Sequence, residues 1–344
     1  MRKVRRPTII DVASRAAVSK STAARALAGA DNILPETRER VLAAAQAVGY
    51  ERNHLAVGMR SGRSGLLGLV IPDIANPFWA EVARGAQDRA VECGLSILVF
   101  SSDWDKAKEE AHLAALRRAR VDGIGINPVS DSFDDLHRFG LPVVMLGSSA
   151  ERFPDVSSVG SDIAQAVELG LDYLVSLGHD TPCLIMGPQT RLAHARFLNA
   201  VYKHVQARDI DPSSLIIEDG GYSLEGGRAA MHRILERPHV GHVCVFAAND
   251  MMAIGALSAI REKGLRCPED VSVLGFDGVP AGAFTYPALT TIAKPGRQIG
   301  ARMVDSLRAE IEGRPERGRV YMPCNLIVRE TIADRFRGVR RQAG

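Results

Sequence analysis

The sequence predicts an α/β protein in which two doubly wound halves follow a small all-α headpiece, and three observations support this. Short helical stretches with capping residues fill the first 50 residues. From residue 66 onward, buried-strand runs alternate with amphipathic helical stretches, as in parallel βαβ units. Charge divides the chain at the same place, because residues 1–64 hold 12 Lys or Arg against 5 Asp or Glu and the remainder holds 31 against 35. A basic headpiece therefore precedes a mildly acidic body.

The headpiece is predicted to contain three short helices. Thr8 and Asp11 have the spacing of a capping box, which starts the first helix. After a short turn, Ser19 offers an N-cap hydroxyl to a second helix over residues 20–27. Pro35 then opens a third helix. Two helices separated by so short a turn form a helix-turn-helix.

The body is predicted to contain eight strands, at residues 66–71, 95–100, 123–126, 143–146, 183–186, 215–217, 243–247 and 271–275. In open α/β sheets, ligands bind beyond the carboxyl ends of the strands. Aromatic, carboxylate, amide and guanidinium groups follow these strands. They suit a polyhydroxylated ligand, although a purine would use the same groups.

Composition and missing motifs exclude several classes of protein. The longest apolar runs fall far short of the roughly 18 to 20 residues that a membrane helix needs, and no export signal is present, so we expect a cytoplasmic protein without a membrane partner. Five cysteines without Cys-x-x-Cys spacing indicate neither a disulfide framework nor a zinc site. His239 and His242 lack further ligands, so no metal and no cofactor are expected.

Five short segments carry a family resemblance that continues in register to about residue 330. They are Thr-Ile-Ile-Asp-Val-Ala at 8–13, Val-Ser-Lys-Ser-Thr at 18–22, Arg-Ala-Leu at 25–27, Thr-Arg-Glu-Arg-Val-Leu at 37–42 and Gly-Tyr at 49–50. The chain resembles the lactose-repressor/galactose-repressor family of bacterial transcription regulators. The resemblance implies a sequence-specific DNA-binding repressor whose operator affinity is controlled by a small effector, most simply a sugar or sugar derivative. It also implies a homodimer on a pseudo-palindromic double-stranded operator at the bacterial nucleoid.

The resemblance implies the domain organisation as well. The body takes the form of two subdomains of periplasmic-binding-protein type, with crossovers near Ser161, Thr290 and Tyr321. The expected divisions are a headpiece at 1–52, a hinge helix and linker at 53–65, and a ligand-binding and dimerisation domain at 66–344, made of an N-subdomain at about 66–160 and 291–320 and a C-subdomain at about 161–290 and 321–335.

In that family the second helix enters the major groove of DNA. The resemblance assigns Lys20 and Ser21 to base edges and Arg25 to bases or phosphates, chemistry that these side chains can perform. The hydroxyls of Thr8, Ser19 and Thr22 are expected to contact phosphates. This sequence departs from the family at Ala17, where Gly is usual, and at Ala24 and Leu34, where Ser is usual.

Residues 53–60 occupy the place of a hinge helix that lies in the minor groove. Asn53 and Met59 are the DNA-binding candidates there, and Met59 stands at the position of an apolar wedge between base steps. The alternative is that Met59 is an exposed linker residue. The switch is expected to be closure of the effector cleft, transmitted to this segment.

The effector candidates combine strand-end position with the resemblance. The resemblance singles out Phe78, Trp79, Tyr222, Asn249 and Asp277, and strand-end position adds Asn127 and Ser148. The family commonly has an Arg where this chain has Ala193, so Arg191 and Arg196 are substitutes.

Each assignment has a plainer alternative. Phe78 and Trp79 suit the subdomain core, and Asp277 suits an N-cap or a surface turn with Gly278. Asn249 and Asp250 suit helix capping, which is expected to fall mostly to Asp250.

Two other functions compete with that of a regulator. An enzyme is disfavoured because no Gly-x-Gly-x-x-Gly, Walker A or Gly-x-Ser-x-Gly pattern is present. A secreted solute-binding protein explains the body but needs an export signal and leaves the headpiece without a role.

Overall fold

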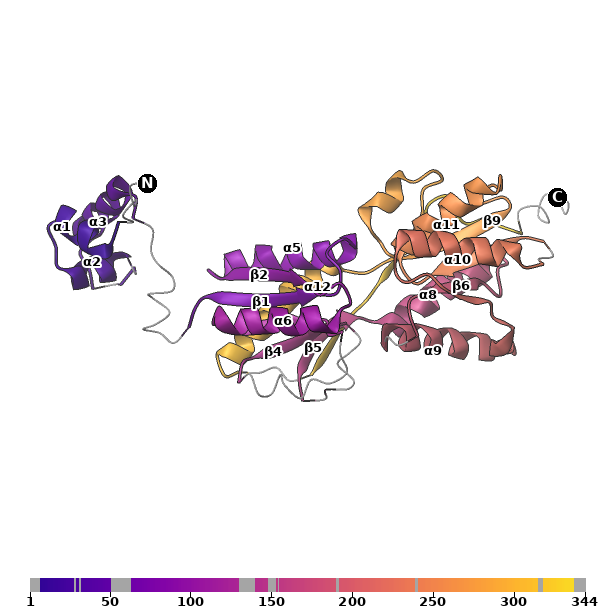
Figure 1. The fold of residues 1–344 in the computed structure, drawn as a ribbon, viewed down its shortest axis with the longest axis horizontal. Coiled ribbons are helices and arrows are strands. Elements are labelled where there is room, and N and C mark those ends of the chain that lie inside the picture. Colours follow the sequence, from indigo (N-terminus) through magenta and orange to yellow (C-terminus); the bar gives the residue numbers. More distant parts are fainter. Residues whose placement is uncertain are drawn as a thin grey trace. The chain divides into compact units, whose positions relative to one another are not determined.

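The computed structural model describes residues 7–27, 29–30, 32–50, 63–129, 140–147, 153, 155–189, 192–238, 241–314 and 318–336. The candidate residues Asn53, Met59, Ser148 and Arg191 lie outside these ranges. The chain divides into two units, Met1–Ser64 and Gly65–Gly344, which are described separately (Figure 1).

The first unit contains the three predicted helices, α1 (Ile9–Arg15), α2 (Lys20–Leu27) and α3 (Pro35–Val48). The capping box is confirmed, because the Thr8 amide and hydroxyl both donate to the Asp11 carboxylate, each at 2.7 Å. The helices enclose a core of small residues: Val12, Ala13, Ala16, Ala23, Ala26, Ile33, Val41, Ala44 and Ala45. Small side chains let three short helices approach closely.

The second unit consists of two lobes, each built on a six-stranded sheet. The N-lobe sheet has the order β11-β5-β4-β3-β1-β2, and all its strands are parallel. Its strands are β1 (Leu66–Ile71), β2 (Ser96–Ser101), β3 (Gly123–Ile126), β4 (Val143–Leu146), β5 (Ser157–Ser161) and β11 (Arg319–Met322), and its helices are α5 (Pro77–Glu92), α6 (Lys106–Arg118) and α12 (Gly296–Ile311).

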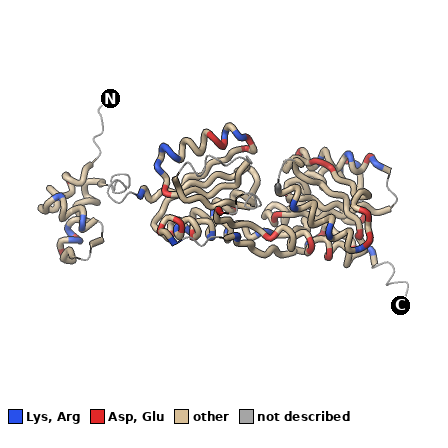
Figure 2. The backbone as a smooth tube through the Cα atoms, turned by 90° about the horizontal axis from the view of Figure 1, so that it is seen from below, with Lys and Arg blue, Asp and Glu red and all other residues tan. Residues whose placement is uncertain are grey.

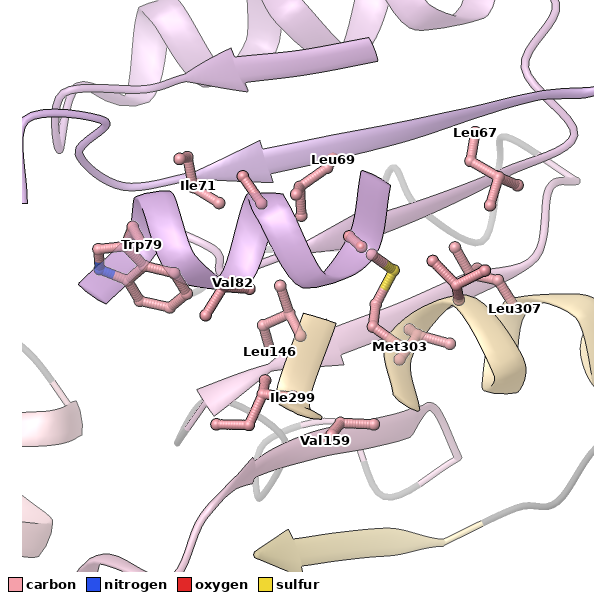
Figure 3. Packing of buried hydrophobic residues seen from close by; sticks show 14 of the residues in the cluster. Leu67, Leu69, Ile71, Trp79, Val82, Leu146, Val159, Ile299, Met303 and Leu307 are labelled. Carbon is pink, nitrogen blue, oxygen red and sulfur yellow. The ribbon is translucent and has the colours of Figure 1, made fainter. Parts of the chain in front are cut away.

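Helices α5 and α12 pack together on one face of the N-lobe sheet, although they are far apart in sequence. Side chains from both helices and from the strands interdigitate in Figure 3, among them Val82, Leu146 and Met303. The helices approach so closely that a Cβ on Gly85 would lie 2.0 Å from the carbonyl oxygen of Arg297. This close contact fixes α5, the helix that carries Phe78 and Trp79, against α12.

The C-lobe sheet has the order β12-β10-β9-β8-β6-β7, and only β12 runs antiparallel. Its strands are β6 (Cys183–Met186), β7 (Ile217–Asp219), β8 (Val243–Ala247), β9 (Val271–Asp277), β10 (Thr290–Ala293) and β12 (Asn325–Ile327). Its helices are α8 (Ile163–Ser176), α9 (Leu192–Gln206), α10 (Leu224–Glu236) and α11 (Asp250–Glu262), with short 3₁₀ turns η2 (Pro212–Ser214) and η3 (Pro280–Phe284).

The chain crosses between the lobes three times. The first crossing follows β5, which ends at Ser161. The second follows β10 at Ala293, because β10 pairs with β9 and therefore belongs to the C-lobe. The third follows β11 at Met322, because β11 pairs with β5. The crossings thus lie within three residues of Ser161, Thr290 and Tyr321.

Charged residues lie mainly outside the strands, and the cysteines are unpaired. Figure 2 shows charged residues mainly along the helices and loops, whereas the strands are mostly uncharged. All five cysteines are free thiols.

Among the residues that the structure describes, no helix combines the length and apolar character that a membrane crossing requires. The same residues contain no cluster of three His, Cys, Asp or Glu side chains suited to a metal ion.

Candidate functional site

The first candidate site is the outer face of α2. The amide of Thr22 donates to Ser19 Oγ at 3.0 Å, so Ser19 caps the helix as predicted. Ser19 Oγ also lies 2.8 Å from Ser21 Oγ and 2.9 Å from Thr22 Oγ1. Three hydroxyls therefore gather at the N-terminus of α2, where the helix dipole favours an anion such as a phosphate.

The cationic side chains of α2 are exposed to solvent. Lys20, Ser21 and Arg25 are exposed, whereas Ala23 and Ala26 are buried in the headpiece core. Residues four apart share one face of a helix, so Ser21 and Arg25 lie one turn from each other. This face offers hydroxyl, ammonium and guanidinium donors, the groups that recognise base edges and phosphates in DNA.

The turn before α2 contains the expected departure from the family pattern. Ala17 has a φ of +52°, in the left-handed region that a glycine adopts without strain. An alanine there costs about 1 to 2 kcal/mol in backbone strain. The turn keeps its geometry because the amide of Val18 donates to the carbonyl of Ala13 at 3.0 Å.

The second candidate site is a cavity between the two lobes, at the carboxyl ends of both sheets. Its volume is about 90 Å³, well below the roughly 300 to 1,000 Å³ of typical ligand pockets. The N-lobe contributes Asp73, Asn76, Phe78, Trp79 and Trp104, and the C-lobe contributes Ile163, Ala193, Phe197, Tyr222, Ala248, Asn249, Phe276, Asp277 and Lys294. We call it the cleft cavity.

A buried ion pair forms one wall of the cleft cavity. Lys294 Nζ lies 2.6 Å from Asp277 Oδ1, and the two side chains are 15% and 3% exposed. The same ammonium lies 3.6 Å from the centroid of the Phe78 ring, so it contacts the N-lobe as well. Asp277 has a φ of +134°, which residues with side chains rarely adopt, so its carboxylate is aimed into the cleft at a cost in strain.

Two carboxylates share this buried region. Burial raises the pKa of Asp277, and the Lys294 ammonium and the Asn76 amide offset part of that rise. Burial, with a smaller contribution from the Asp277 carboxylate, raises the pKa of Asp250 to about 7. Asp250 accepts hydrogen bonds from the Val279 amide at 2.7 Å and from the Thr291 hydroxyl at 2.6 Å. Asp250 therefore braces the segment that presents Asp277.

The assignment of capping to Asp250 was wrong. Asn249 is the N-cap of α11, because its side-chain oxygen accepts from the Met252 amide at 2.8 Å. The amide nitrogen of Asn249 donates to the carbonyl of Tyr222 at 3.1 Å. Asn249 thus links α11 to the loop that carries Tyr222, and it lines the cleft cavity as well.

The structure brings five of the predicted effector residues together in the cleft cavity: Phe78, Trp79, Tyr222, Asn249 and Asp277. Phe78 and Trp79, at 6% and 9% exposure, belong to the N-lobe core, as the plainer interpretation predicts, and they line the cleft cavity as well. Asp277 does not lie in a surface turn, because it is 5% exposed.

Two predicted residues do not line the cleft cavity. Asn127 turns its amide to the carbonyl of Leu146, to which it donates at 2.8 Å. Arg196 places its guanidinium 5.8 Å from the centroid of the Tyr321 ring, with Nη2 donating to the Tyr321 hydroxyl at 3.4 Å.

Sequence reasoning missed Lys294 and Trp104. Lys294 directly follows β10, a strand that periodicity did not reveal, so the strand-end rule was not applied to it. Trp104 lies three residues beyond the end of β2, and it was not singled out from the sequence.

Comparison with known proteins gives matches for both units. The model of the bacterial regulatory proteins of the lacI family matches residues 8–53, and that of the periplasmic binding protein-like domain matches residues 171–332. The transcriptional regulator MalR of Streptomyces coelicolor is 33% identical, over 94% of this chain and 96% of its own.

Solved structures match over similar lengths. The lac repressor dimer bound to operator and the anti-inducer ONPF has a TM-score of 0.84 at 28% identity, covering 96% of this chain and all of that one. A lacI family regulator from Enterococcus faecium with bound ribose has a TM-score of 0.70 at 27% identity, covering 78% of this chain and 99% of that one.

Proposed function

The chain belongs to the lacI family of bacterial transcription regulators, and from this premise we propose that it is an operator-binding repressor controlled by a sugar-like effector in the cleft cavity. The observation that carries the proposal is the combination within one chain of an exposed, donor-rich helix-turn-helix face and an aromatic cleft with buried carboxylate and amide groups. Such a protein works in the cytoplasm, at the nucleoid.

In this proposal, α2 reads the operator. Lys20 and Ser21 contact base edges, Arg25 contacts a base or phosphate, and the hydroxyls of Ser19 and Thr22 hold phosphates that set the register. The exposure of Lys20, Ser21 and Arg25 on α2, and of Ser19 directly before it, supports these roles. Thr8, exposed at the start of α1, holds a further phosphate.

A single helix-turn-helix covers one half-site, so the proposal includes a homodimer on a pseudo-palindromic operator. The C-lobe offers a surface for pairing, because Phe284 and Tyr286 are 88% and 98% exposed and lie in or beside η3. Aromatic side chains so exposed are favourable to bury in an interface. We therefore assign the η3 region to the contact between two copies.

The effector is proposed to bind between the lobes. The Asp277 carboxylate accepts hydrogen bonds from sugar hydroxyls, Asn249 supplies a second polar contact, and Phe78, Trp79 and Tyr222 contact the apolar faces of the ring. Because the cleft takes side chains from both lobes, a bound effector changes the balance between open and closed forms. That change reaches the segment at residues 53–60, which joins the N-lobe to the headpiece in sequence.

The experiment that tests the proposal selects operators from random duplex DNA and then titrates sugars into the complex. We expect a pseudo-palindromic operator, whose affinity a sugar changes by at least about fivefold. Asp277→Asn serves as the matched variant, because it should lose the sugar response while operator binding without sugar stays close to that of the unsubstituted protein. Failure to select any duplex contradicts the regulator, and sugar sensitivity retained by Asp277→Asn contradicts the assigned effector site.

A further inference from the structure

The rings of Trp104 and Tyr222 meet across the cleft, one from each lobe. Their centroids lie 5.6 Å apart with an interplanar angle of 18°, which is a stacked arrangement. Both side chains line the cleft cavity and both are half-buried. The pair therefore faces the cavity on one side and solvent on the other. It forms an outer wall of the cleft cavity.

Trp104 lies on a strained backbone segment that local hydrogen bonds hold in place. Trp104 has a φ of +59°, and Asp103 before it has a φ of +49°. The Asp103 carboxylate accepts from the Ser101 hydroxyl and from Lys108 Nζ, each at 2.7 Å, and the Trp104 amide donates to the carbonyl of Pro72 at 3.2 Å. Two consecutive left-handed residues persist only when their surroundings impose them, and such strain gathers at ligand sites.

Tyr222 is held as firmly on the other side. It also adopts a left-handed φ, +58°, and its carbonyl accepts from the Asn249 amide. Its ring lies directly on the backbone of Gly187, where an added Cβ would come within 2.0 Å of the ring. The ring therefore has no room to retreat toward β6.

The far side of the cleft cavity is closed as well. There the Lys294–Asp277 ion pair and Phe78 form a wall of the cavity, and the same three residues line a second cavity of about 240 Å³ near the start of α12. A ligand larger than the cleft cavity would extend through its half-buried wall, the place that Trp104 occupies.

From these contacts we propose that Trp104 determines effector size and restricts the site to a single sugar ring. The proposal rests on the effector function assigned above. A monosaccharide enters as the lobes separate and is covered by the indole when they return. The second ring of a disaccharide needs the space of the indole, a group of comparable size.

The test compares Trp104→Gly with the unsubstituted full-length protein by isothermal titration calorimetry. Glycine removes the indole and adopts the left-handed φ without strain, so the variant keeps its fold. Monosaccharide probes are ribose, glucose and galactose, and disaccharide probes are cellobiose, maltose and lactose. We expect at least one disaccharide to bind Trp104→Gly at least about tenfold more tightly than the unsubstituted protein. Trp104→Phe is the matched control, because it keeps a ring on Tyr222 and should remain closed to disaccharides.

The decisive quantity is the difference in disaccharide affinity between the two proteins. If the unsubstituted protein binds a disaccharide as tightly as Trp104→Gly does, or if Trp104→Gly binds none, Trp104 does not set the size limit. These measurements contain no DNA, so they are separate from the test of the proposed regulator. If Trp104→Gly gains disaccharide binding but no sugar changes the operator affinity, the proposed sugar-controlled regulator is contradicted. The size limit set by Trp104 is not.

Discussion

Removing the ammonium of Lys294 should destabilise the second unit in a pH-dependent way. Lys294→Met keeps the length of the side chain but leaves the Asp277 carboxylate, 3% exposed, without its cation. Breaking a buried ion pair by removing one partner costs about 3 to 5 kcal/mol. Loss of the ammonium over the Phe78 ring is part of that cost, at about 0.5 to 2 kcal/mol.

Protonation of Asp277 limits this cost. Burial already raises the pKa of Asp277, and removal of Lys294 raises it further because the ammonium lowers it. The pKa of Asp277 in the folded protein lies above its value of about 3.9 in the unfolded chain. Its contribution to the free energy of unfolding is therefore fully present below about pH 3.9 and is lost as the pH rises through the folded pKa. The penalty should therefore be small near pH 5 and approach about 3 to 5 kcal/mol near pH 8.

The assay is urea unfolding of the full chain, followed by far-UV circular dichroism at about pH 5 and about pH 8. The double variant Lys294→Met/Asp277→Asn carries no charge at the site and should recover most of the loss at the higher pH. An equal penalty at both pH values, together with no recovery in the double variant, would refute the proposed electrostatic origin.

Four further outcomes are expected. Lys20→Ala should relax operator discrimination at one base pair by about 1 to 3 kcal/mol, and operator selection with an unchanged consensus would remove Lys20 from base readout. Ala17→Gly should stabilise the headpiece by up to about 1 kcal/mol by relieving a φ of +52°, and thermal melting of the headpiece transition checks this. Tyr286→Asp should convert dimers to monomers in sedimentation at micromolar concentration, whereas dimers that persist would place the interface elsewhere. Burial lowers the pKa of His179, so the unfolded chain binds a proton that the folded one resists, and stability should fall below about pH 6.5; His179→Gln should weaken that dependence in urea titrations, and an unchanged slope would contradict it.

Strands that are apolar throughout were predictable from the sequence. The ranges of β1, β3, β4, β6 and β8 match the predicted ones, because central parallel strands are covered on both faces and are therefore continuous apolar runs. β5 escaped prediction because its sequence, Ser-Ser-Val-Gly-Ser, is mostly polar or small although all its residues are buried. Its burial comes from its position between β4 and β11, which only the assembled sheet supplies.

Site residues that follow a recognisable strand were predictable from the sequence. Residues whose positions depend on long-range packing were not. Tyr222, Asn249 and Asp277 follow recognisable strands, so the strand-end rule placed them correctly at the cleft. Lys294 follows a strand of four residues that lacks a distinctive pattern. The stacking of Trp104 on its partner depends on left-handed backbone angles at non-glycine residues, which the residue types do not signal.

The positions of Trp79 and Trp104 make intrinsic tryptophan fluorescence a direct probe of the cleft. These are the two tryptophans of the whole chain, and both line the cleft cavity. Intrinsic indole fluorescence therefore arises entirely from the cleft, and the headpiece contributes none. Effector entry should change the emission directly, whereas duplex DNA should change it only through coupling to the cleft. A single unlabelled sample thus yields the effector affinity and, when the titration is repeated with operator present, the energetic coupling between the two binding events.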